Sequence, residues 1–125
     1  MNDASIFLST LLNRGNRALA GYAAAELLDS HPRAGSALGA DALSSWQNWL
    51  ASRLEELAAA LAAEDARIFA REVGWARSLA SARGVPSEYL RSGLECLRAV
   101  LTRELPESVR ALADESLGAA LDSFD

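Results

Sequence analysis

Lysine is absent from this 125-residue sequence, and cysteine and histidine each occur only once. The 12 basic residues are all arginine, which is typical of a GC-rich genome, and they are scattered rather than clustered on one face. A single cysteine cannot form an internal disulfide, which fits a reducing cytoplasm. One histidine excludes His-rich metal sites and the Glu-x-x-His pairs of di-iron bundles. We therefore expect a cytoplasmic protein without a bound metal or other cofactor.

Motifs for nucleotide binding and membrane insertion are also missing. Neither GxxxxGK[ST] nor GxGxxG occurs, so phosphate-cradling loops are excluded. The apolar run IFLSTLL near the start is too short to span a bilayer, and it lacks the basic region of a signal peptide. The net charge of −5 argues against general binding to nucleic acid or to an anionic membrane. No catalytic motif is present, so enzymatic activity is not expected.

The residues that are present favour helices. Hydrophobic residues make up 50% of the chain, Ala, Leu, Arg and Glu dominate, and β-branched residues are scarce. We predict a single all-α domain across residues 1–125, folded as an antiparallel bundle of about four to five helices.

Apolar periodicity and capping residues place the helices along the chain. Their expected spans are about 3–29, 42–63, 66–83, 87–104 and 106–124. Asp41 and Ser87 are expected as N-caps, Gly84 as the residue after a helix end, and Pro106 as a first helical residue. A break in the first helix near residues 13–16 is an open alternative, and HPRAGSALGA reads as a loop.

Leucine stripes mark the faces expected to be buried. The first helix has Leu8, Leu11, Leu12, Leu19 and Tyr22; the second has Leu43, Trp46, Leu50, Leu54, Leu57 and Leu61; the fourth has Leu90, Leu94, Leu97 and Leu101. Ile6, Leu27 and Leu28 fall outside the arc of the first helix. Because a small bundle cannot cover both sides of that helix, we expect a homodimer through it.

Glu72 falls in the middle of the apolar arc of the third helix. Burying this carboxylate unpaired would cost several kcal/mol. Arg53 lies between Trp46 and Trp49 on the wheel of the second helix. A hairpin turning at residues 64–65 would place Arg53 opposite Ala76, one turn from Glu72. The sequence therefore predicts an Arg53–Glu72 pair beneath Trp46, Trp49 and Trp75.

Three interpretations of these residues stay open at this point. The pair can be a structural ion pair that fixes helix register. It can orient a ligand in a pocket lined by tryptophan. In the third interpretation the wheel is misphased and Glu72 points to water.

The remaining reactive side chains have ordinary interpretations. His31 precedes a proline in a loop, where a solvated or capping histidine is expected. Cys96 lies beside the apolar arc of the fourth helix, where a buried, inert thiol is expected.

Several motifs of the second half of the chain are shared with a family of helical domains. They are Phe69-x-x-x-Val73-x-Trp75-Ala76-Arg77, Arg83-Gly84-Val85-Pro86 and Leu94-x-x-Leu97-x-x-Val100-Leu101. The region from Tyr22 to Phe124 resembles the helical N-terminal domain of some bacterial cobalamin-binding and sensor-regulator proteins. It is similar in outline to the N-terminal modules of Rsb-type stress regulators. The chain departs from them by ending at Asp125 without an output domain or a cobalamin-binding motif.

The resemblance implies a sensory or interaction module. We expect a non-enzymatic regulatory protein that acts through contacts with itself and with a regulatory protein partner. The alternative is a sensor of a small molecule or a tetrapyrrole, with a tryptophan-lined pocket around Arg53 and Glu72.

Overall fold

The computed structural model describes residues 3–36 and 41–124, and all regular secondary structure within these ranges is helical. In chain order the elements are α1 (Asp3–Ser30), the 3-10 turn η1 (Pro32–Ser36), α2 (Ala42–Ala62), α3 (Ala66–Ala82), α4 (Ser87–Glu104) and α5 (Glu107–Asp122). The predicted all-α bundle is confirmed. Part of the predicted loop is the turn η1, and residues 37–40 lie outside the described residues.

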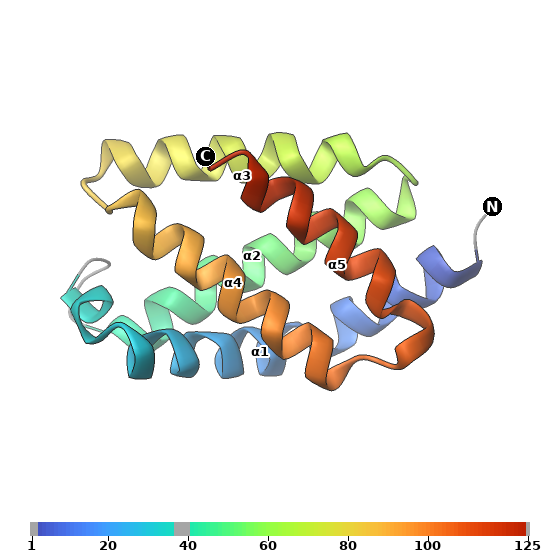
Figure 1. Cartoon of the computed structure of the whole chain (residues 1–125), viewed down its shortest axis with the longest axis horizontal. Coiled ribbons are helices and arrows are strands. Elements are labelled where there is room, and N and C mark those ends of the chain that lie inside the picture. Colours follow the sequence, from blue (N-terminus) through green and yellow to red (C-terminus); the bar gives the residue numbers. More distant parts are fainter. Residues whose placement is uncertain (1–2, 37–40, 125) are drawn as a thin grey trace.

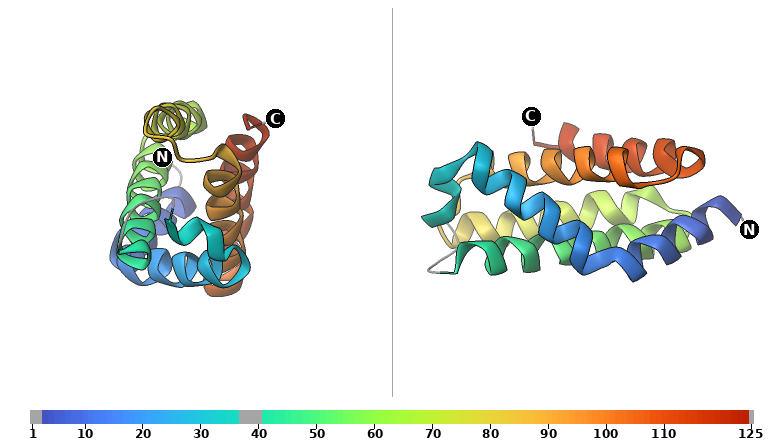
Figure 2. Two further views of the ribbon diagram at one scale, coloured as in Figure 1. Left: turned by 90° about the vertical axis from the view of Figure 1, so that its left-hand side faces the viewer. Right: turned by 90° about the horizontal axis from the view of Figure 1, so that it is seen from below.

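Consecutive long helices run in opposite directions (Figure 1). α1 packs mainly against α2 and α4, and α4 pairs with α5. α3 lies on the opposite side of the bundle from α1, as the end-on view in Figure 2 also shows. It touches α2, α5 and α4. α3 is therefore an edge helix with one side turned away from the bundle.

Leucine and alanine fill most of the core, and Trp46 and Phe69 are its largest fully buried side chains. The predicted α4 stripe is buried as expected. Leu43 and Tyr22, however, were expected inside and are 50% and 52% exposed. Leu27, which was expected outside the arc, is fully buried. Small residues explain the shift on α1, because its buried face is completed by Ala20, Ala23 and Ala24, which let α2 and α4 approach closely.

The first helix is continuous through residues 13–16, so the alternative of a break there is wrong. Asn16 is buried there, and its side-chain Nδ2 donates a hydrogen bond of 2.8 Å to the carbonyl oxygen of Ala51 on α2. Two turns earlier, the Ser9 hydroxyl donates to the carbonyl of Ala58 at 3.0 Å. These polar side chains serve to dock α1 on α2 rather than to interrupt it.

The helix ends follow ordinary capping chemistry with two corrections. Asp41 accepts a hydrogen bond from the backbone of Ser44, as predicted for an N-cap, and Gly84 takes a positive φ of 86°. Ser87 is the first residue of α4 rather than its N-cap, and its hydroxyl instead accepts from Arg77. Pro106 lies one residue before α5 rather than within it. None of the helices in the described ranges has the length and apolarity that crossing a bilayer requires.

Candidate functional site

A groove of about 360 Å³ lies between α2 and α3. Its lining consists of Trp49 and Arg53 from α2, Ala76, Leu79 and Ala80 from α3, and Arg83 and Val85 from the turn that follows. Arg53 and Ala76 both line it, so the predicted register of the two helices is correct. Its volume falls at the lower end of the range of small-molecule sites.

Trp49 and Arg53 form the floor of this groove on the α2 side. They are four residues apart, a spacing that places side chains next to each other on a helix. The guanidinium carbon of Arg53 lies 4.7 Å from the centre of the Trp49 ring. Trp46 meets Trp49 edge to face, with 5.9 Å between ring centres. Trp49 therefore holds the arginine in one orientation, because a cation above an indole face is attracted to it.

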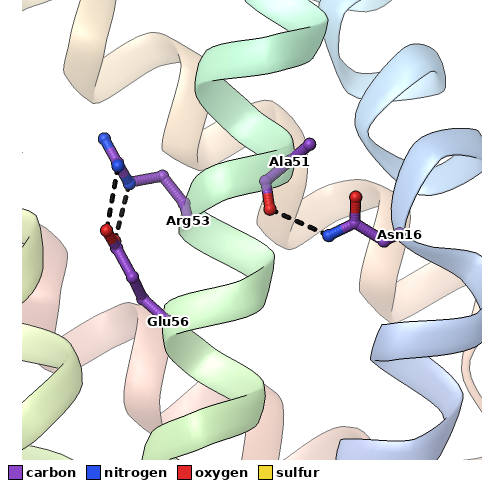
Figure 3. A network of polar contacts seen from close by, with 4 residues as sticks. All are labelled: Asn16, Ala51, Arg53 and Glu56. Carbon is purple, nitrogen blue, oxygen red and sulfur yellow. Dashed lines mark hydrogen bonds and ion pairs between the residues drawn. The ribbon is translucent and has the colours of Figure 1, made fainter.

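The carboxylate partner of Arg53 is Glu56, one turn further along α2 (Figure 3). Arg53 Nε donates to Glu56 Oε1 at 2.7 Å, and Arg53 Nη2 donates to Oε2 at 2.9 Å. The Arg53 side chain is only 8% exposed, whereas that of Glu56 is 21% exposed. The remaining nitrogen, Nη1, is buried without a hydrogen-bond partner. The site thus holds a fixed positive group with one unused donor.

Burial raises the pKa of Glu56 above its ordinary value of 4.5, and the attraction and hydrogen bonds of Arg53 offset part of that rise. The nearby carboxylates of Glu72 and Glu55 add to it. For the Glu56 carboxylate, desolvation therefore outweighs the stabilisation that Arg53 gives to its ionised form.

The predicted Arg53–Glu72 pair is wrong. The Glu72 side chain is 40% exposed, and its Oε1 lies 4.0 Å from Nε of the adjacent Arg71. Trp75 does not cover the site either, since it is 64% exposed. Trp46 is fully buried, and its indole nitrogen donates to the carbonyl of Ala34 at 2.9 Å. Of the five residues proposed, only Trp49 and Arg53 line the groove.

The error has a physical source in the width of the apolar arc of α3. The face that packs consists of Phe69, Val73, Ala76 and Ala80. Trp75 and Leu79 belong to the same apolar arc but lie outside its packed part. Glu72 lies on the boundary between the packed residues and these two exposed ones. Because α3 is an edge helix, its neighbours cover only half of its apolar side. The middle of the apolar arc on the helical wheel is therefore not the middle of the face that is buried.

Four residues form what we call the α3 stripe: Glu72, Trp75 and Leu79 on the uncovered side of α3, and Arg83 directly after the end of the helix. Successive members are three or four residues apart, so they follow one another along a single side of the helix. Leu79 is 44% exposed and, like Arg83, also lines the groove. The stripe and the groove are thus adjoining parts of one surface.

A second hollow, lined by His31, Cys96 and the acidic residues Glu26, Asp29 and Glu95 among others, lies between α1 and α4. Burial, together with the charges of Glu26 and Glu95, raises the pKa of the Cys96 thiol. The thiol therefore stays protonated at neutral pH and is a poor nucleophile. Among the described residues, no group of three or more His, Cys, Asp and Glu side chains could hold a metal ion.

Comparisons of the chain with protein-family models, with curated proteins and with solved structures gave no match.

Proposed function

We propose that this chain is a non-enzymatic regulatory module that acts through protein contacts, and that one partner is a second copy of the chain. The observation that carries the proposal is the α3 stripe, where Trp75 and Leu79 are 64% and 44% exposed side by side. Large apolar side chains that adjoin on a surface mark an interaction site. The resemblance to helical domains of bacterial sensor-regulators favours the same role.

The charges of the stripe make it complementary to itself. Glu72 and Arg83 are equally far from the point between Arg77 and Ser78, at five residues from the nearer of the two. If two α3 helices pair antiparallel with their two-fold axis at that point, each Glu72 faces the Arg83 of the other copy. Trp75 and Leu79 are then enclosed between the two ion pairs. A two-fold interface of this kind needs one surface that fits a copy of itself.

The first helix is the weaker candidate for self-association. Its exposed large apolar residues are Ile6 and Phe7, near the start of α1, at 40% and 47%, and Tyr22, much further along the helix, at 52%. Leu27 lies in the core, and Leu28 packs partly against it. Much of the apolar area on which that expectation depended is therefore covered inside the bundle.

Sedimentation equilibrium at high micromolar concentration tests the proposal with charge reversals. Glu72→Arg and Arg83→Glu should each weaken the dimer, because each places like charges opposite one another. The double variant Glu72→Arg with Arg83→Glu should restore it. Arg14→Glu makes the same charge change at an exposed position of α1 and should leave the dimer unaltered.

A monomer at every concentration, or a dimer that Phe7→Ser breaks and the reversals leave intact, would refute dimerisation through α3. Trp75→Ser should abolish association without affecting the fold, since this side chain is mostly in solvent.

The second candidate function is a small-molecule sensor, and the groove beside Arg53 favours it. A tetrapyrrole is the less suitable occupant, because the groove is small and its lining residues do not include His31, the single histidine of the sequence.

A further inference from the structure

We infer that the groove between α2 and α3 binds a small molecule with a flat apolar ring and one carboxylate, and that the carboxylate is held by Arg53. The inference rests on the second candidate function, the small-molecule sensor, and does not require self-association, although Leu79 and Arg83 belong to both the groove and the α3 stripe.

The polar end of the site is defined by Arg53 Nη1. The Arg53 side chain is 8% exposed, and Nη1 has no hydrogen-bond partner although its other nitrogens are bonded to Glu56. Leaving a charged donor buried and unpaired is costly. An acceptor that arrives in the groove removes that cost, and a carboxylate does so best because a charge-assisted bond is the stronger kind.

The charges of the lining favour an anion over a cation. Arg53 and Arg83 both line the groove, and none of the described residues that line it is acidic. Glu56 is adjacent, but both of its oxygens are already engaged by Arg53. The whole chain has a net charge of −5, so general attraction of anions by the protein surface is not the cause.

The rest of the lining selects an apolar ring. Ala76, Leu79, Ala80 and Val85 offer only hydrocarbon, and the Trp49 indole closes the α2 side. The alanines leave the space that a flat ring needs, since larger side chains there would fill it. Nη1 is itself buried, so a bond to the carboxylate requires a side-chain shift within the groove.

The probe for the site is 2-naphthoate, and its matched control is 2-naphthamide, which has the same ring without the charge. Binding is followed by NMR of the full chain, with the Trp49 indole N–H and the Arg53 Nε–H as reporters. We expect the naphthoate to shift both signals and to bind about tenfold or more tightly than the amide.

Two variants test the charge of the site and its free space separately. Arg53→Met with Glu56→Leu removes the guanidinium and its partner together, and it should lower naphthoate affinity to that of the amide. Ala76→Leu fills the groove from α3 and should abolish binding of both probes while Arg53 stays in place. Arg83→Gln should weaken naphthoate binding, whereas Arg14→Gln, on α1 and outside the groove, should not.

Equal affinity for the two probes would overturn the inference, as would no detectable binding of either at millimolar concentration. Shifts confined to residues around His31 and Cys96 would also overturn it, because they would place the ligand in the other hollow. Loss of self-association in Glu72→Arg, which leaves every lining residue of the groove in place, with naphthoate binding retained, would leave this inference standing on its own.

Discussion

Two nitrogens of the Arg53 guanidinium bond both oxygens of the Glu56 carboxylate, at 2.7 and 2.9 Å, and both residues belong to α2. The pair is therefore internal to one helix and does not tie α2 to α3. The register of those helices depends on apolar packing instead, through residues such as Phe69 and Val73. The arginine is pre-positioned beside the groove whether or not α3 moves.

Removing Glu56 should lower the free energy of unfolding more than removing Arg53 does. Glu56→Gln leaves a guanidinium that cannot lose its proton, so it should lower the free energy of unfolding by about 3–5 kcal/mol. Arg53→Met leaves a carboxylate that can take up a proton, so its cost should be smaller, about 1–3 kcal/mol at neutral pH. Urea unfolding of both variants measures the difference.

The cost of Arg53→Met should also depend on pH. Burial already raises the pKa of Glu56 above 4.5, so the folded state binds more protons than the unfolded state just above that pH. The stability that the protonated Glu56 carboxyl contributes is then present below pH 4.5, and it is lost as the pH rises through the pKa of Glu56 in the folded state. The variant should therefore be closest to wild type in acid. A cost that grows as the pH falls would contradict this assignment.

Glu72→Gln should be nearly neutral for stability, within about 0.5 kcal/mol. The side chain is 40% exposed and its nearest basic group, on Arg71, is 4.0 Å away, so no buried charge is left behind. Thermal unfolding at a concentration where the chain is monomeric measures this. A loss as large as that of Glu56→Gln would show that the Glu72 carboxylate is paired inside the bundle.

The helices were accessible from the sequence because each buried face repeats at three- and four-residue steps. The α4 stripe and the opposition of Arg53 and Ala76 followed from this periodicity and from the tight turn at residues 64–65. Burial on α3 could not be obtained in the same way. A wheel gives the centre of an apolar arc, but which half of a wide arc is covered depends on the neighbouring helices.

The candidate site was predictable only where its residues share one helix, because the sequence does not show how neighbouring helices are placed. Trp49 and Arg53 share a helix face, so their proximity is a local property that the sequence contains. Glu56 was missed because an arginine and a glutamate three residues apart on a helix usually form an ordinary solvated pair. Leu79 and Arg83 had no signal of their own, since the groove they line exists only once α2 and α3 are placed side by side.

Trp46→Phe should destabilise the fold more than its small loss of volume implies. The Trp46 indole donates to the carbonyl oxygen of Ala34, and both residues have no exposed area. Phenylalanine leaves that carbonyl unpaired, at a cost of about 1–3 kcal/mol. Trp75→Phe, on the exposed side of α3, is the matched control and should be near neutral. Hydrogen exchange in η1 should rise only in Trp46→Phe, and equal exchange in both variants would refute the anchoring role.

The pair between Arg98 on α4 and Asp114 on α5 should give the chain an acid-sensitive link. Arg98 Nε and Nη2 bond the two oxygens of Asp114 at 2.5 and 2.9 Å. The hydrogen bonds from Arg98 lower the pKa of Asp114 below its ordinary value of 3.8. Between the two pKa values the unfolded state binds more protons, so this contribution is present above pH 3.8 and is lost as the pH falls through the folded pKa.

Asp114→Asn should therefore lower the free energy of unfolding at neutral pH and leave it unaltered in strong acid. Both side chains are more than a third exposed, at 39% and 46%, so solvent and salt screen the pair. The expected loss is only about 0.2–1 kcal/mol, and it should shrink further in high salt. Glu115→Gln, which removes the exposed carboxylate next to Asp114 on α5, is the matched control. A loss that persists unchanged below the folded pKa would mean that Asp114 stabilises α5 by packing rather than by its charge.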